Sequence, residues 1–131
     1  MKKRYFTLKE AEELLPEISF KIRNLIKLSR AINLLNKIKI SYEDEFDFIT
    51  HEINSRKNLH KLYHEFYKLL EEILNYGAIV KDLNFGIIDF YSKHNEKEIF
   101  LCWQLGEEKI KYWHEAYSGY DKRKPIELLK A

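Results

Sequence analysis

Apolar residues recur every three or four positions over residues 8–38, which is the spacing of one face of an α-helix. Thr7 and Glu10 form a capping box in front of this stripe, so a helix is expected to begin there. Pro16 lies inside the pattern and predicts either a kink or a short first helix that ends near Leu15. The stripe consists of Leu8, Ala11, Leu15, Ile18, Ile22, Leu25, Leu28, Ile32, Leu35 and Ile38.

A second helical pattern extends from about Glu45 to Tyr76, and Gly77 provides the stop signal. Residues 40–44 form the expected turn between the helices, and the polar residues 54–58 predict fraying or a bend. Both helices would be roughly 45 Å long. Equal lengths and a short connection predict an antiparallel hairpin. The apolar face of the second helix consists of Phe46, Ile49, Ile53, Leu59, Leu62, Tyr63, Phe66, Leu69, Leu70 and Ile73.

After Gly77 the apolar period changes to two, which is typical of strands. The expected strands are 78–81, 84–91, 98–103 and 109–115, with a polar loop at 92–97 and a short amphipathic piece at 126–129. This order predicts an α+β fold. A long antiparallel two-helix hairpin (1–76) would precede a small antiparallel β-sheet of about four strands and a tail (77–131), all within one domain.

Charge and apolar surface both favour self-association of the hairpin. Residues 1–40 carry ten Lys and Arg against four Asp and Glu, whereas residues 41–76 carry four against eight. These opposite signs favour pairing of the two segments. The sheet can cover only one end of so long a hairpin, and the rest would be an apolar patch that monomers avoid. We therefore predict a homodimer in which two hairpins form a four-helix bundle.

The cysteine count and the hydropathy pattern limit the cellular setting. A single cysteine excludes an internal disulfide and a zinc site built on cysteines, and it fits a reducing cytoplasm. No apolar run has the length of a signal peptide or a membrane span, so we expect a cytoplasmic protein without membrane contact. The net charge of +2 is too small to imply nucleic acid by itself.

Four stretches of the chain resemble a known family. They read YFTLxEAxxLLP at 5–16, VKDLxxGIIDF at 80–90, LCWxLGExxIxxWHE at 101–115 and GYxxRxPI at 119–126. Together they resemble the prokaryotic domain of unknown function 2203, and the resemblance covers nearly all of the chain outside the variable helical part at about 20–75. The family has no assigned activity, so the resemblance implies a relationship and supplies no function.

The third of these stretches is the densest in residues that carry chemistry, because it holds both tryptophans, the cysteine and a His-Glu pair. His114 and Glu115 are adjacent on a predicted strand, so their side chains point to opposite faces. His114 can instead join Glu107, from the preceding turn. A carboxylate from the neighbouring strand, Asp89 or Asp82, can complete the group. A histidine with two carboxylates suits a divalent metal ion or acid–base chemistry, and a structural hydrogen bond under an aromatic lid is the alternative.

The remaining candidates surround this group. Asp89 is unusual in a strand, and it is expected to form a buried salt bridge with Arg123 or His114 or to take part in the site. Trp103 and Trp113 are expected in the core, since each buries on the order of 200 Å². Alternatively they form an aromatic wall beside Arg123 and Tyr117 that stacks a base or ring. The candidate ligand-binding residues are Asp82, Asp89, Trp103, Glu107, Trp113, His114, Glu115 and Arg123.

Other residues give weaker signals. His60 and His64 are four apart on one helix face, but the HExxH pattern is absent, so a half-exposed surface is expected rather than a metal pair. Cys102 is expected to be a small buried hydrophobe. The basic groups at 2–4 and 122–124 could contact phosphate, with a solvated surface as the alternative.

Three functions are therefore open. The first is a dimeric binding or interaction module with the His, carboxylate, Trp and Arg cluster between sheet and helices. The second is a metal-dependent, hydrolase-like enzyme that uses His114, Glu107 and Asp89 with a divalent metal ion. The third is a nucleic-acid accessory protein that uses the basic ends of the chain.

Overall fold

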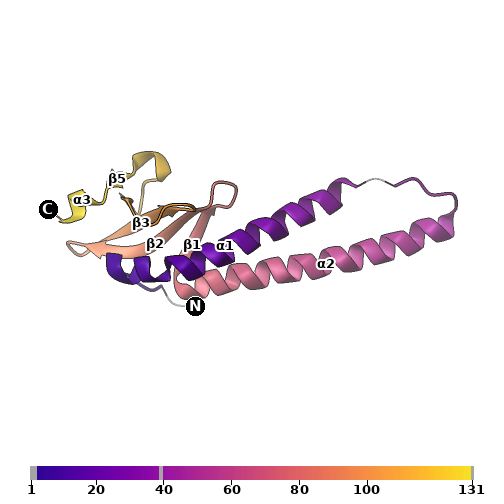
Figure 1. Cartoon of the computed structure of the whole chain (residues 1–131), viewed down its shortest axis with the longest axis horizontal. Helices are drawn as coiled ribbons and strands as arrows, with labels where there is room; N and C mark the ends of the chain where they lie inside the picture. Colours follow the sequence, from indigo (N-terminus) through magenta and orange to yellow (C-terminus); the bar gives the residue numbers. More distant parts are fainter. Residues whose placement is uncertain (1–2, 39, 131) are drawn as a thin grey trace.

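The computed structural model describes residues 3–38 and 40–130. It has the predicted α+β fold, in which a helical hairpin is followed by an antiparallel sheet with the strand order β1-β2-β3-β4-β5 (Figure 1). The elements are α1 (Leu8–Lys37), α2 (Glu45–Tyr76), β1 (Ala78–Asp82), β2 (Ile87–His94), β3 (Lys97–Gln104), β4 (Tyr112–Glu115), the 3₁₀ turn η1 (Tyr120–Lys122), β5 (Lys124–Pro125) and α3 (Glu127–Lys130).

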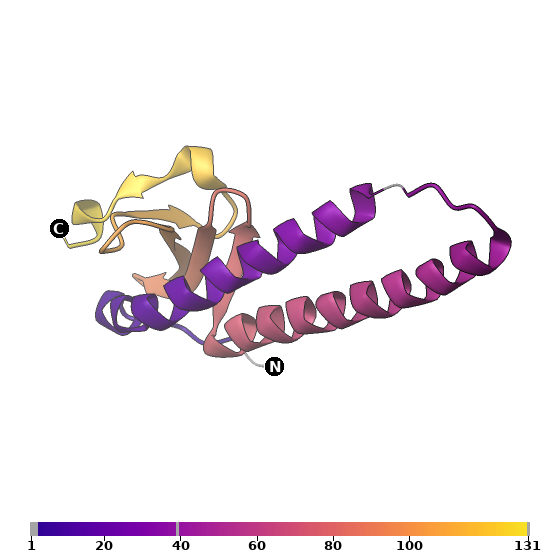
Figure 2. The same cartoon turned by 45° about the vertical axis from the view of Figure 1, so that its right-hand side comes forward.

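The two helices begin where the capping signals predict. Both hydrogen bonds of the capping box between Thr7 and Glu10 are present at the start of α1, and Asp44 caps α2 by accepting from the backbone N–H of Asp47. Helix α1 continues through Pro16, so the alternative of a short first helix is wrong. A proline inside a helix removes one backbone hydrogen bond and strains the preceding turn. The long helical segments on both sides of Pro16 can offset this cost. The first turns of α1 lie at an angle to the remainder (Figure 2).

The sheet differs from the prediction at the turns and in the tail. The expected polar loop at 92–97 is wrong, because β2 and β3 extend to a two-residue turn in which Asn95 and Glu96 have φ angles of 51° and 65°. The second strand begins at Ile87, since residues 83–86 form a turn that ends with Gly86 at a φ of 67°. The predicted tail supplies the fifth strand, β5, which pairs with β4.

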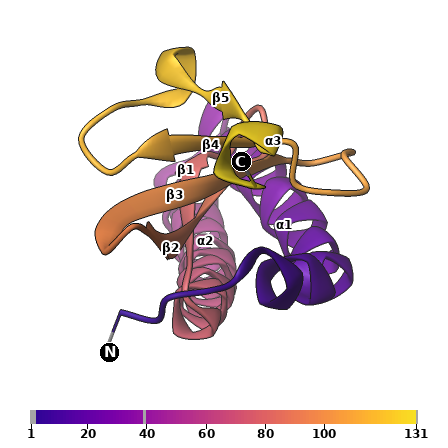
Figure 3. The same ribbon diagram turned by 90° about the vertical axis from the view of Figure 1, so that its left-hand side faces the viewer.

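The sheet has two different faces. Phe90 of β2, Trp103 of β3 and Trp113 of β4 belong to the same buried core as Ile18 and Ile22 of α1. Figure 3 shows α1 alongside the sheet on this side. Because side chains alternate along a strand, the intervening residues point to the opposite face.

The outer part of the hairpin has almost no core of its own. In the described chain, α1 has no buried residue after Ile32 and α2 has none before Leu59. The two helices diverge toward the tip of the hairpin (Figures 1 and 2). None of the described helices contains a segment that is both long and apolar enough to cross a membrane. The exposed large apolar residues of the hairpin are Phe20, Leu34, Ile38, Ile40, Phe46, Phe48, Ile49, Ile53, Tyr63, Tyr67 and Leu74.

Candidate functional site

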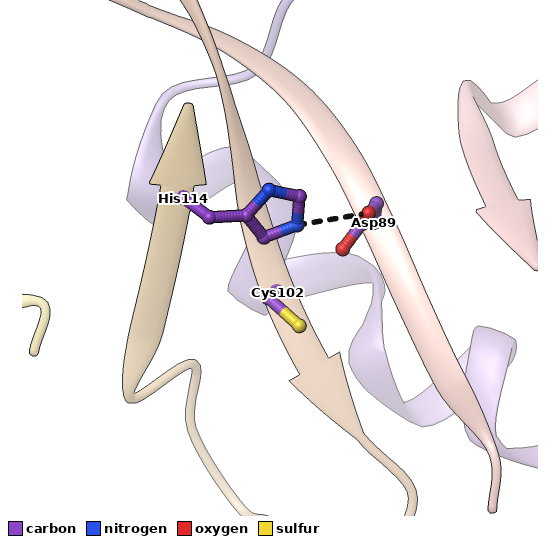
Figure 4. Close-up of side chains that lie close together, drawn as sticks. All are labelled: Asp89, Cys102 and His114. Atoms are coloured by element: carbon purple, nitrogen blue, oxygen red, sulfur yellow. Dashed lines mark hydrogen bonds and ion pairs between the residues drawn. The ribbon is translucent and has the colours of Figure 1, made fainter. Parts of the chain in front are cut away.

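Three neighbouring strands contribute one polar residue each to a buried cluster on the face of the sheet that α1 does not cover. Asp89 comes from β2, Cys102 from β3 and His114 from β4, and their side chains point toward one another (Figure 4). One ligand atom of each residue lies within 4.8 Å of the others. The three residues are 1%, 0% and 2% exposed. We call these three residues the polar cluster.

The strand register explains why these residues meet. Asp89 and Cys102 are direct cross-strand partners, and His114 lies opposite Phe100, two positions along β3 from Cys102. Residues two apart on a strand share a face. Cys102 is small, and the imidazole of His114 therefore reaches across β3 to Asp89. The distance between His114 Nε2 and Asp89 Oδ2 is 3.1 Å.

The hydrogen bonds of His114 fix where its protons lie. Its Nδ1 is 2.9 Å from the carbonyl oxygen of Glu115, and a carbonyl only accepts, so Nδ1 carries a proton. Its Nε2 faces the carboxyl group of Asp89 at 3.1 Å, so a proton or another cation must lie between the two atoms, because their lone pairs would otherwise oppose each other. Burial lowers the pKa of His114, but the hydrogen bond and the charge of Asp89 and the Glu115 carbonyl together raise it above its usual value.

Arg123 closes the cluster from the C-terminal segment. Its guanidinium carbon lies 4.2 Å from the ring centre of Tyr112 and 3.7 Å from that of Tyr120, so the cation is held between two aromatic faces. Burial, followed by the charge and hydrogen bond of Asp89, raises the pKa of Cys102 to about 12, and the nearby Arg123 opposes this rise. Cys102 is therefore a neutral thiol between a carboxylate and a guanidinium.

Two buried polar atoms beside this cluster have no hydrogen-bond partner. They are Asp89 Oδ1 and Arg123 Nη1, and every other buried side-chain nitrogen or oxygen of the described residues has a hydrogen-bond partner. A buried polar group without a partner costs about 1–3 kcal/mol, and it calls for an explanation such as an ion, water or ligand.

The chain matches the family described as "Uncharacterized conserved protein (DUF2203)" over residues 4–126. The chain belongs to this family. No curated protein and no solved structure matches it. In this DUF2203 chain the polar cluster and Arg123 come from three separate stretches, at 80–90, 101–115 and 119–126, which also carry the resemblance to the family. The fold thus brings these three stretches of the chain into one place.

Glu107, the carboxylate predicted to join His114, lies elsewhere in the DUF2203 structure. Its carboxylate accepts from the backbone N–H of Gln104 at 2.7 Å, and its carbonyl accepts from the indole N–H of Trp103 at 2.8 Å. Together with Trp103, it lines an open hollow of about 330 Å³ between α1 and the β3–β4 turn. Trp103 belongs to the core that faces α1, so Glu107 and the polar cluster are on different sides of the sheet.

The other predicted residues have local partners. Asp82 accepts from the backbone N–H of Phe85 in the β1–β2 turn, and the carboxylate of Glu115 pairs with Lys124. Trp113 is buried, and its indole N–H donates to the carbonyl of Pro125. The predicted location between sheet and helices therefore holds for the two tryptophans and is wrong for Asp89 and His114.

Cys102 is the member of the polar cluster that the sequence reasoning missed. Its position opposite Asp89 follows from the two-residue turn at Asn95 and Glu96, so a correct placement of that turn would have revealed it. The pair His60 and His64 is exposed on α2, and neither belongs to a metal-binding group within the described residues. Lys2, part of the basic N-terminal group, lies outside the described residues.

Proposed function

We propose that this DUF2203 chain is a homodimeric binding module. Two copies pair through their helical hairpins, and each sheet keeps the face with the polar cluster and Arg123 free to bind a ligand. The observation that carries the dimer is the surface area: the chain exposes 9399 Å², whereas a compact chain of 15.9 kDa exposes about 7,300 Å². The excess is about 2,000 Å² per chain, or about 4,000 Å² for two, which is within the range of obligate homodimers.

The excess surface includes an apolar stripe along α2. Its members Phe46, Ile49 and Ile53 are separated by three and four positions, and Tyr67 and Leu74 continue it farther along the helix. This is the spacing with which one helix packs against another. Because Leu59 and Ile73 point inward to α1 instead, α2 carries two apolar faces and only one of them has a partner within the chain.

The charges of the hairpin favour a partner that is a second copy. The segment 1–40 is basic and the segment 41–76 is acidic, and within one chain Lys21 pairs with Glu72 at 2.9 Å. A two-fold arrangement in which α1 of one copy lies against α2 of its partner makes the same charge pairing available between copies. The stripe then joins a four-helix bundle, and the sheets lie at the outer ends.

A metal-dependent hydrolase using His114, Glu107 and Asp89 has less support. Glu107 is not part of the polar cluster, and the residues that do meet are nearly inaccessible to a substrate. A catalytic site requires an open position that a substrate can reach. We therefore favour, for this face of the sheet, the binding of a ligand as small as an ion over the turnover of a larger substrate.

One observation favours nucleic acid as a second candidate partner. Cations lie over aromatic rings on the same side of the sheet: Lys93 Nζ is 4.4 Å from the ring centre of Tyr5, and Lys3 Nζ is 4.9 Å from that of Tyr91. Basic and aromatic side chains together suit single strands. The test is binding to single-stranded RNA and DNA at several salt concentrations. Affinity should fall as salt rises, and absent or salt-independent binding would dismiss this candidate.

Light scattering on the purified chain tests the dimer. We expect twice the chain mass of 15.9 kDa at micromolar concentration. The double variant Ile49→Asp, Ile53→Asp should give a single chain, because it would place charged carboxylates in the apolar stripe, where pairing of the copies would remove their water. Both positions are exposed within one chain, so the hairpin itself should persist. The control is Phe85→Asp, which changes a still more exposed apolar side chain in the β1–β2 turn and should leave the dimer intact. A wild-type chain that is monomeric would overturn the proposal.

A further inference from the structure

We propose that Asp89, Cys102 and His114 bind a divalent metal ion of the zinc class through Oδ2, Sγ and Nε2. This inference deepens the binding role proposed above by naming the ligand, and it does not depend on the dimer. Nitrogen, sulfur and carboxylate oxygen are the donors that zinc uses in proteins. The three atoms come from three strands of one sheet, which is a rigid frame for a coordination site.

The distances fit a shared cation. In a tetrahedral zinc site, bonds of about 2.0–2.2 Å separate a nitrogen and an oxygen ligand by about 3.3 Å. His114 Nε2 and Asp89 Oδ2 are 3.1 Å apart. The sulfur of Cys102 completes a triangle whose edges do not exceed 4.8 Å. A sulfur ligand at about 2.3 Å from the ion would lie about 3.6 Å from each of the other two donors, so metal binding requires Sγ and these donors to approach each other by about 1.2 Å at most.

The orientation of the imidazole supports the same conclusion. A metal-bound histidine usually donates its other ring N–H to a backbone carbonyl or a carboxylate, which fixes the ring and directs its lone pair at the metal. His114 Nδ1 makes such a bond with the carbonyl of Glu115. Its Nε2 faces a carboxylate oxygen, so the space between them requires a positive charge. A metal ion can supply that charge in place of a proton.

The charge of the site is unchanged when the metal ion replaces protons. Without metal, His114 and Asp89 share one proton between Nε2 and Oδ2 and are neutral as a pair, Cys102 is a neutral thiol, and Arg123 brings the sum to +1. With metal, the ion adds two charges while the shared proton and the Cys102 Sγ proton leave, so the sum is again +1. Each bound ion therefore releases two protons, as metal binding to a protonated site must. The positive charge of Arg123 does not oppose metal binding, because the total charge of the site is the same with and without the metal ion.

The two unpartnered atoms, Asp89 Oδ1 and Arg123 Nη1, are polar groups that a fourth ligand of the metal could satisfy. Three protein donors leave a fourth position for water or an anion. A bound water can donate to Asp89 Oδ1 and accept from Arg123 Nη1, which lack partners in the described chain. We expect the ion to enter past Arg123 and Tyr112, which are partly exposed, and past the exposed Lys81, whose Nζ lies 5.1 Å from the ring centre of Phe100.

The test is titration of the chelator-treated full chain with Co²⁺ and then Zn²⁺. We expect one Co²⁺ per chain, a near-ultraviolet thiolate-to-cobalt charge-transfer band, and displacement by Zn²⁺, which binds such sites more tightly. The dependence of the binding heat on the buffer should give close to two protons released per ion. Absence of saturable binding, or binding without the thiolate band, would overturn the proposal. This readout uses the wild-type chain and separates failure of the site from failure of the dimer.

Variants then assign the donors. Cys102→Ser should abolish the charge-transfer band, and Asp89→Asn or His114→Gln should weaken binding by more than about 100-fold, beyond the 10–100-fold effect of losing an outer-shell partner. Glu107→Gln is the matched control and should bind as the wild type does. The double variant His60→Ala, His64→Ala should also have no effect. If that double variant abolished binding while Cys102→Ser did not, the metal would lie on α2 and the inference would be wrong.

Discussion

The replacement Asp89→Asn probes the buried ion pair in the metal-free protein. Asparagine has nearly the same shape as aspartate, so the change removes a charge and leaves the packing in place. His114 then loses the carboxylate that holds its second proton, while its Nδ1 stays bonded to the Glu115 carbonyl. Both side chains of the pair are 2–3% exposed, so water cannot replace the lost partner.

The expected loss of stability is about 3 kcal/mol. Breaking a buried pair by removing one partner costs about 3–5 kcal/mol, and His114 recovers part of this by releasing a proton. The pKa of His114 is raised in the folded state, so the pair stabilises fully below the ordinary histidine pKa of about 6.5. This contribution is lost as the pH rises through the raised folded-state value. The difference between wild type and variant should therefore be largest near pH 6 and smaller near pH 9.

Urea unfolding with a chelator, at one fixed protein concentration, measures this difference. A loss of 3 kcal/mol corresponds to a midpoint shift of about 1–3 M urea. Asp121→Asn provides the control, because Asp121 is exposed and its charge should matter little. A variant Asp89→Asn within about 0.5 kcal/mol of the wild type at pH 6 would refute the reasoning that the pair is charged and buried.

Two further predictions concern the backbone and the thiol. Gly77→Ala should destabilise the chain by about 1–3 kcal/mol, because its φ of 99° is strained for alanine and the new Cβ would lie 2.8 Å from Phe6 Cε2. The control Gly106→Ala, with a φ of 104° and no atom within 4 Å of the new Cβ, should cost less in the same unfolding assay. Equal costs for the two variants would argue against the Phe6 contact. Burial and Asp89 raise the pKa of Cys102 to about 12, so a thiol reagent at pH 8 should react with the metal-free folded chain only at its opening rate; immediate labelling would contradict the burial.

The sequence predicts the helices better than the sheet. Helical spacing repeats over some thirty residues and is bounded by Thr7 and Gly77, so local signals suffice for both ends of the hairpin. The strands are short, and their turns depend on left-handed residues. Asn95 and Glu96 adopt positive φ without any glycine, so the turn that sets the β2–β3 register has a weak sequence signal.

Only part of the candidate site could be predicted, because the register of the strands has a weak sequence signal. The pairing of His114 with Asp89 was one of the expected alternatives, and the structure contains it. The expected contribution of Glu107 is absent, because its position before β4 places it on the side of α1 and in contact with Trp103. Cys102 entered the cluster only once the register was known. Contacts between strands depend on register, and one-residue errors exchange the two faces.

The proposed dimer rests on the exposed apolar face of α2, which the spacing of apolar residues in the sequence does not identify. Helical spacing predicts apolar faces, but only the structure shows which face of α2 packs on α1 and which remains exposed. Ile73 points inward, whereas Leu74, the next residue, belongs to the exposed stripe. The same helix therefore contributes to the core of one chain and to the proposed contact with its partner.

Hydrogen exchange of the wild-type chain at concentrations above and below its dissociation range tests the central claim most directly, because it shows where two copies meet. The account predicts that dilution increases exchange in the outer hairpin, at residues 28–37 and 45–58, where one chain has almost no core. Exchange in β2, β3 and β4 should stay the same, since the face with the polar cluster is outside the interface. Dilution-dependent exchange in those strands, with none in the hairpin, would contradict it.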